Sequence, residues 1–210
     1  MKKLIVLLVA AAVIGMAYFT AQVILTPMRF EKIMESRNSV LQKQLKTIAD
    51  AEKAYEELNG RYATIDELKD FLKNGRVYHI NAEGEYTDEM RDQGFTEQDA
   101  VAKGLIKRDT IWSPAKDKFI AEGQDVDDLS KVLTTGQEFK IDTASKIQVI
   151  GMDSIRIPLF QATVEYKTYL SGIDQSSLDA KISKENDKKN GFPGLRIGSL
   201  TEAKMTGNWE

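Results

Sequence analysis

An uncharged run from Leu4 to Leu25 constrains this chain more than any other feature of its sequence. As a helix the run would extend about 33 Å, which is long enough to cross the apolar core of a bilayer. Only Thr20 and Gln22 are clearly polar, and both lie near its C-terminal end. The run therefore predicts a single-pass membrane anchor over residues 1–27. The side chains expected to face lipid include Leu4, Leu8, Val13, Phe19, Val23 and Leu25.

A cleavable secretory signal is the alternative interpretation of this run. Two lysines precede it, and the small residues Gly15 and Ala17 resemble a cleavage region. The apolar run continues past Ala17 to Leu25, which favours a retained signal anchor. Long hydrophilic domains cross membranes largely regardless of flanking charge. We therefore expect the anchor in the inner (cytoplasmic) membrane and the remaining chain in the periplasm or otherwise outside the cytoplasm.

The composition excludes most routes to catalysis and to nucleic-acid binding. The chain carries 29 basic and 32 acidic residues, a net charge of -3, and so lacks the basic excess that phosphate backbones select. It has no cysteine, which removes disulfides, thiolate zinc sites and cysteine nucleophiles. Its single histidine, His79, lies in a strand-like run and is expected to be structural or exposed. We expect no nucleic-acid partner and no cofactor.

A stem helix is predicted after the anchor, over residues 28–60. Pro27 suits a helix start or a kink better than a helix interior, so we expect the anchor to bend or restart there. From Phe30 to Leu58 the chain contains neither proline nor glycine. Apolar residues in it recur at spacings of three and four, which places them on one helix face. This face packs on the protein's own domain, the favoured interpretation, or on a partner helix. It comprises Leu41, Leu45, Ile48, Ala51, Tyr55 and Leu58.

The segment IADAEKAYEELNGRYATIDELKDFL, residues 48–72, carries a family resemblance. An apolar N-terminal helix, a stem, an Asn-Gly-Arg-Tyr turn at 59–62 and a short following helix resemble the stem-to-head junction of type IV pilins and type II secretion pseudopilins. Thr64 and Glu67 form a capping box that opens the following helix. The resemblance implies a stem helix packed on an antiparallel sheet. Lys3 stands where prepilins carry their cleavage glycine, and no early glutamate follows it, so the resemblance concerns shape rather than peptidase processing.

Residues 61–210 are predicted to form a globular head. Strand-forming residues in its C-terminal half predict an antiparallel sheet, in which Pro158 implies a bulge or an edge. A polar stretch at 184–190 is expected to be a solvated loop. The expected strands are 138–141, 146–150, 155–160 and 162–170. The predicted fold class is α+β, a transmembrane helix extended by a stem helix that packs on a pilin-like antiparallel sheet.

Shorter signals occupy the middle of the chain. Residues 76–80 predict a short strand and residues 81–94 a loop. Thr96 is expected to cap a short helix. Residues 109–114 predict a strand or turn, and residues 128–132 a single turn of helix.

Three further features invite a chemical interpretation, and each is more simply structural. The densest acidic cluster lacks the spacing of an EF-hand loop, so we expect a solvated turn there and no metal. Residues 191–199 contain three glycines without the strand-glycine-helix context of a phosphate cradle. Trp112 and Trp209 are expected to close the core or its rim rather than to stack on a ligand. The acidic cluster comprises Glu122, Asp125, Asp127 and Asp128.

These features together predict a membrane-anchored, non-enzymatic structural or interaction subunit of a cell-envelope assembly, pseudopilin-like in construction. Its expected partners are the membrane and envelope proteins, and no small-molecule substrate is evident. The alternative is a membrane-tethered binding module that does not polymerise. A minor alternative is a hydrolase that uses carboxylates such as Asp109 or Asp153 as acid and base.

Overall fold

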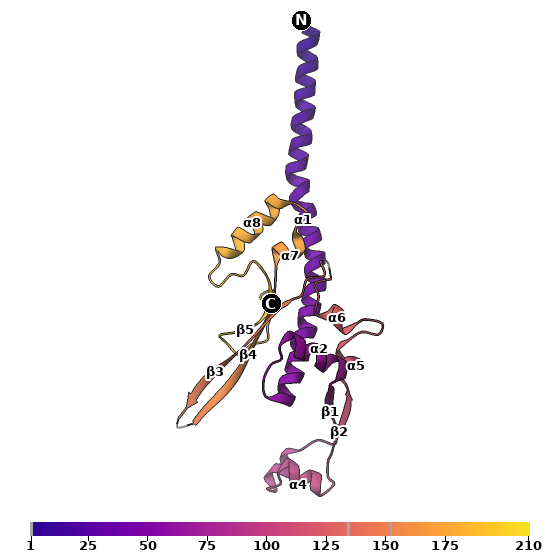
Figure 1. Ribbon diagram of the computed structural model, residues 1–210, viewed down its shortest axis with the longest axis vertical. Coiled ribbons are helices and arrows are strands. Elements are labelled where there is room, and N and C mark those ends of the chain that lie inside the picture. Colours follow the sequence, from indigo (N-terminus) through magenta and orange to yellow (C-terminus); the bar gives the residue numbers. More distant parts are fainter. Residues whose placement is uncertain (1, 134, 152) are drawn as a thin grey trace. The chain divides into compact units, whose positions relative to one another are not determined.

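The computed structural model describes residues 2–133, 135–151 and 153–210, which form a mixed α+β protein (Figure 1). A long N-terminal helix is followed by two small antiparallel sheets. The chain divides into two compact units. The first contains residues 1–49 and 128–210, and the second contains residues 50–127. The predicted division into anchor, stem and a single head stays a prediction.

Helix α1 runs without interruption from Lys2 to Asn59 and contains Pro27. The predicted restart at Pro27 is therefore wrong. Proline removes one backbone donor, the one that would bond to the carbonyl of Val23, and the strong helix formers on both sides carry the helix across this gap. Asn59 ends the helix, and Gly60 follows with a positive φ of 70°. This left-handed position favours glycine, as the sequence predicted.

The first unit buries part of α1 together with a three-stranded sheet of order β3-β4-β5. Strand β3 is Lys140–Ile150, β4 is Asp153–Glu165 and β5 is Gly194–Ser199. Helices α7 (Tyr166–Leu170) and α8 (Gln175–Asn186) connect β4 to β5. The largest buried apolar side chains of this unit are Leu41, Leu45, Ile48, Val132, Phe160, Tyr169, Leu170 and Leu178.

Two predictions for this unit are wrong, and one is confirmed. Residues 166–170 form a helix rather than the end of a strand, and the loop predicted at 184–190 is wrong over 184–186, because helix α8 extends to Asn186. Tyr166, Tyr169 and Leu170 have the i, i+3, i+4 spacing of one helix face, and the helix buries all three. Pro158 lies in the part of β4 that pairs with β3 alone, because β5 pairs only with Phe160–Glu165. This edge position was predicted from the missing proline N–H.

The second unit begins with the C-terminal end of α1 and helix α2 (Ile65–Asn74). Strands β1 (Arg76–Glu83) and β2 (Lys107–Pro114) pair as an antiparallel hairpin. Between them lie the short helices α3 (Asp88–Asp92) and α4 (Glu97–Ala102). Helix α5 (Ala115–Phe119) follows β2, and α6 (Val126–Leu129) lies at the boundary of the two units.

The local signals in the second unit were predictive. Thr64 accepts a hydrogen bond from the backbone N–H of Glu67, whose carboxylate accepts one from the backbone N–H of Thr64. This is the predicted capping box. Thr96 caps α4 in the same way with Asp99, which confirms the predicted cap. The predicted loop at 81–94 is shorter than expected, because β1 extends to Glu83 and α3 forms within it.

Candidate functional site

The N-terminal part of α1 is a candidate membrane span. Its most apolar window has a mean hydropathy of 2.5, and none of that window is buried inside the protein (Figure 1). The few polar side chains bond within the helix, as a lipid environment requires. Thr20 Oγ1 donates to the carbonyl oxygen of Met16 at 2.8 Å, and Gln22 Nε2 donates to the hydroxyl of Tyr18 at 3.1 Å. This helix is therefore compatible with a transmembrane or signal anchor.

The predicted anchor side chains all lie on the outside of the structure. Their exposed fractions range from 70% for Phe19 down to 43% for Leu25. Soluble proteins rarely expose an apolar surface of this length to water, so this surface is expected to contact lipid or another protein. The exposed anchor positions are Leu4, Leu8, Val13, Phe19, Val23 and Leu25.

The predicted stem face is buried at its start and more open at its end. Leu41, Leu45 and Ile48 are buried in the first unit, and Ala51 is buried in the second. Tyr55 is half-buried, and Leu58 is 37% exposed. Gln44 Nε2 also ties α1 to the first unit, because it donates to the carbonyl oxygens of Asp128 and Lys131. This part of α1 is thus a component of the protein's own core.

A buried carboxyl group, Glu52, lies at the junction of α1 and α2. Its side chain is fully buried, and its Oε2 accepts a hydrogen bond of 2.8 Å from the backbone N–H of Ala63. Among the described residues no donor reaches its Oε1. Burial raises the pKa of Glu52 to about 8, because a charged carboxylate loses its hydration there. Glu52 therefore carries its proton at neutral pH.

A second acidic residue at this junction behaves in the opposite way. Arg61 binds Glu67 with both terminal nitrogens, at 2.9 and 2.5 Å, and its guanidinium lies 5.7 Å from the centre of the Tyr55 ring. The hydrogen bonds from Arg61 lower the pKa of Glu67 to about 2. Tyr55 meets Phe71 edge to face, with ring centroids 5.4 Å apart. Ionic and aromatic contacts thus fix the turn between α1 and α2.

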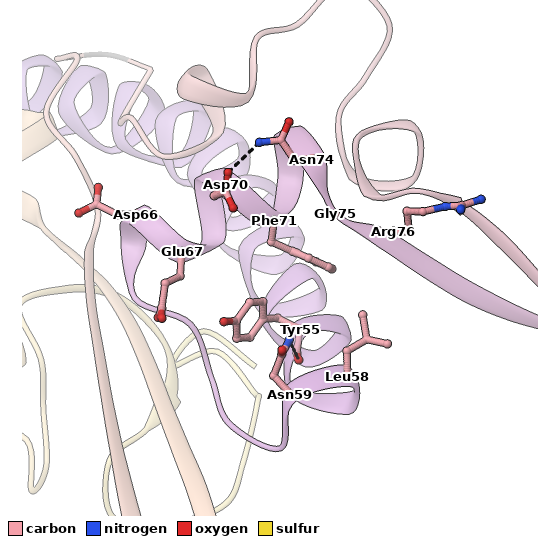
Figure 2. Close-up of a pocket in the computed structure, with 10 residues that line it drawn as sticks. All are labelled: Tyr55, Leu58, Asn59, Asp66, Glu67, Asp70, Phe71, Asn74, Gly75 and Arg76. Atoms are coloured by element: carbon pink, nitrogen blue, oxygen red, sulfur yellow. Dashed lines mark hydrogen bonds between the residues drawn. The ribbon is translucent and has the colours of Figure 1, made fainter.

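A cavity of about 600 Å³ opens beside this junction, and Figure 2 shows its walls. Its floor is aromatic, and its charged groups do not converge on one point. Figure 2 shows Asp66 and Arg76 on opposite sides, directed outward, while Asp70 accepts a hydrogen bond from Asn74. The walls are formed by Tyr55, Leu58, Asn59, Asp66, Glu67, Asp70, Phe71, Asn74, Gly75 and Arg76.

The other residues that the sequence singled out as candidates for catalysis or metal binding do not line this cavity. His79 is exposed on β1, opposite Ile111. Within the described ranges no group of three or more histidine or acidic residues is placed to hold a metal ion. Asp127 of the acidic cluster pairs with Lys73 at 2.9 Å. Asp109 lies in β2 of the second unit, and Asp153 begins β4 of the first.

The remaining candidates are placed as follows. Trp112 is 47% exposed on β2 and so lies outside the core, and Trp209 is half-buried; the expectation that they close the core or its rim stays a prediction. Residues 194–199 of the glycine-containing segment form strand β5.

Sequence reasoning missed Glu52. The signal was available, because Glu52 lies four residues after Ile48 and three before Tyr55, on the apolar face itself. An acidic residue on a stripe that becomes core must be neutral or paired.

Comparison of the chain with protein-family models, with curated proteins and with solved structures finds no match. The fold and the exposed helix define a class only: a mixed α+β protein with one candidate membrane span.

Proposed function

We propose that this protein is a membrane-anchored, non-enzymatic interaction subunit of a cell-envelope assembly, with a pseudopilin-like construction. One observation carries the proposal: a single continuous helix exposes an apolar surface from Leu4 to Leu25 and contributes core side chains further along. Such a helix serves as both an anchor and a structural spine. We place the anchor in the inner membrane, with the two folded units outside the cytoplasm.

The mass and membrane partition of the full-length protein from its own cells test the anchor. We expect an intact chain that stays in the membrane after a carbonate wash and is released by detergent. A shorter chain that begins near Met16 or Tyr18, found in the soluble fraction, would show a cleaved signal and contradict the proposal.

Assembly is tested by recovery of other envelope proteins with the detergent-solubilised chain. Co-purification of defined envelope proteins supports the subunit role. Recovery of the chain alone, folded and at natural abundance, argues against it. Removal of residues 1–60 is unsuitable for this test, because it deletes the buried side chains Leu41, Leu45 and Ile48.

One observation favours the second candidate, a tethered binding module that does not polymerise. Tyr78 and Trp112 are direct cross-strand partners on β1 and β2, with ring centroids 5.6 Å apart. Both are exposed, and so is the neighbouring Ile80 at 51%. Exposed aromatic pairs are typical of binding surfaces. If a partner is lost in the Tyr78→Ser/Trp112→Ser variant while self-assembly is unchanged, the binding module is the better description.

A further inference from the structure

Strand β3 forms an outer edge of its sheet. It pairs with β4 from Lys140 to Ile150, and no described strand pairs with its other side. The free edge begins at Lys140, because the N–H of the preceding Phe139 donates to the carbonyl oxygen of Ser130 at 2.9 Å. Every second N–H and C=O of an edge strand points outward and lacks a ladder partner. This edge is therefore available to another strand.

The exposed side chains of β3 agree with an open edge. All residues from 143 to 149 are exposed, and Ile147 and Val149 are exposed by 62% and 71%. The β3–β4 hairpin extends well beyond the part of β4 that β5 covers (Figure 1). Long apolar edges of this kind promote pairing between chains unless they are protected by charge. The charges on β3 decide which strand it accepts.

The sequence of β3 is complementary to itself when reversed. Around Ala144 the residues run Ile-Asp-Thr-Ala-Ser-Lys-Ile, from 141 to 147. In an antiparallel pair of two such strands centred on Ala144, Ile141 lies opposite Ile147, and Asp142 lies opposite Lys146. Thr143 then lies opposite Ser145. Each pair occurs twice, because the two-fold axis repeats it.

The same charges oppose three of the other two-fold registers that keep each side chain on its face, and a fourth, centred on Ser145, gains no charge pair because it places Asp142 opposite Gln148 and Lys146 opposite Ala144. A pair centred on Thr143 places Lys140 opposite Lys146. A pair centred on Asp142 or on Lys146 places that residue opposite its own copy. Like charges directly opposite destabilise a pair of strands, whereas opposite charges stabilise it. Only the register centred on Ala144 joins Asp142 to Lys146.

We propose that two copies of this chain join through β3, antiparallel, over residues 140–148 and with Ala144 on the two-fold axis. The partner is a second copy because the charge pattern matches its own reverse. Strand pairing supplies main-chain hydrogen bonds, and the isoleucine pairs cover part of the exposed Ile147. Asp142, which already pairs with Lys140 at 3.2 Å, gains a second cation from the other copy. This β3 contact deepens the proposed interaction role, and its meaning in the cell rests on that proposed function. Formation of the contact itself does not depend on the membrane anchor.

Cysteine cross-linking of the full-length protein in detergent tests the register. The natural chain has no cysteine, so a single substitution gives an unambiguous signal. Ala144→Cys places two sulfurs opposite each other across the axis, where Cα atoms lie about 4.5–5.5 Å apart, within reach of a disulfide. Gln148→Cys is the matched control on the same face, because its two copies would lie about 27 Å apart. We expect a cross-linked dimer for Ala144→Cys at a level that Gln148→Cys does not approach. Equal cross-linking of the two variants overturns the proposal.

Charge exchange provides an independent test. Asp142→Lys replaces two attractive pairs by two repulsive ones and is expected to weaken dimer formation about tenfold. Asp142→Lys/Lys146→Asp restores the complementarity with the signs exchanged and is expected to restore the dimer. A double variant no better than Asp142→Lys contradicts the proposal.

Membrane partition of the same variants is measured in parallel. Normal partition without a dimer refutes only the β3 contact, and a soluble dimer refutes only the anchor.

Discussion

The carboxyl group of Glu52 accepts a hydrogen bond of 2.8 Å from the backbone N–H of Ala63, eleven residues further along the chain. This bond joins the last turns of α1 to the segment that leads into α2. It is made by a group with no access to water. The stability of the junction is thereby coupled to one proton.

Glu52 predicts a pH dependence of stability. Its pKa is raised from 4.5 to about 8, so the folded protein holds a proton that the unfolded chain releases. This contribution to stability is complete below about pH 4.5 and is lost as the pH rises through 8. The free energy of unfolding should fall by up to about 1.4 kcal/mol per pH unit within this window.

Urea unfolding at pH 5 and pH 8 measures the effect. Glu52→Gln keeps an oxygen acceptor for Ala63 and does not ionise, so its loss of stability between the two pH values should be smaller. Glu57→Gln, an exposed position on the same helix, is the control and should behave as the unchanged protein. The interpretation fails if Glu52→Gln retains the full pH dependence.

The buried stem face predicts that substitutions at two positions of α1 change the free energy of unfolding by different amounts. Leu45 is fully buried, whereas Val40, in the same unit, is 44% exposed. Leu45→Ala should lower the free energy of unfolding by about 2–5 kcal/mol, because it removes buried methyl groups and leaves a cavity. Val40→Ala should change it by less than about 1 kcal/mol. Denaturant midpoints in detergent measure both, and similar losses at the two positions would show that this face of α1 is not core.

The hydrogen bond between Tyr169 and Asn38 predicts that these two residues of the first unit are energetically coupled. Its buried hydroxyl donates to Asn38 Oδ1 at 2.7 Å, and Arg37 donates to its backbone carbonyl. Burial raises the pKa of Tyr169, so the hydroxyl remains a donor in the physiological range. Tyr169→Phe should cost about 1 kcal/mol. A double-mutant cycle with Asn38→Ala should give a coupling energy of similar size, and strict additivity would show that the bond contributes nothing.

The anchor predicts a position-dependent effect of charge. Val13 lies near the middle of the apolar run, where an arginine costs about 2.5–3.5 kcal/mol for insertion. Val13→Arg should therefore reduce the carbonate-resistant membrane fraction, and Val13→Leu should leave it unchanged. Full membrane retention of Val13→Arg would indicate that a folded unit, rather than the helix, holds the protein at the membrane.

The amino-acid sequence by itself determined the elements that depend on neighbouring residues. The uncharged run, the long helix without glycine from Phe30 to Leu58, and the cap at Thr64 with Glu67 all follow from local spacing. Each needs only contacts within one or two turns of helix, and those contacts are written in adjacent residues.

Tertiary structure alone decided the rest. Residues 166–170 became helical because burial of Tyr169 and Leu170 outweighed a strand-like alternation. Glu52 acquired its raised pKa only when other parts of the chain excluded water from it. Local propensity is worth tenths of a kcal/mol per residue, whereas burial of one large side chain is worth about 2 kcal/mol. Where the two compete, the arrangement of distant residues therefore decides the structure.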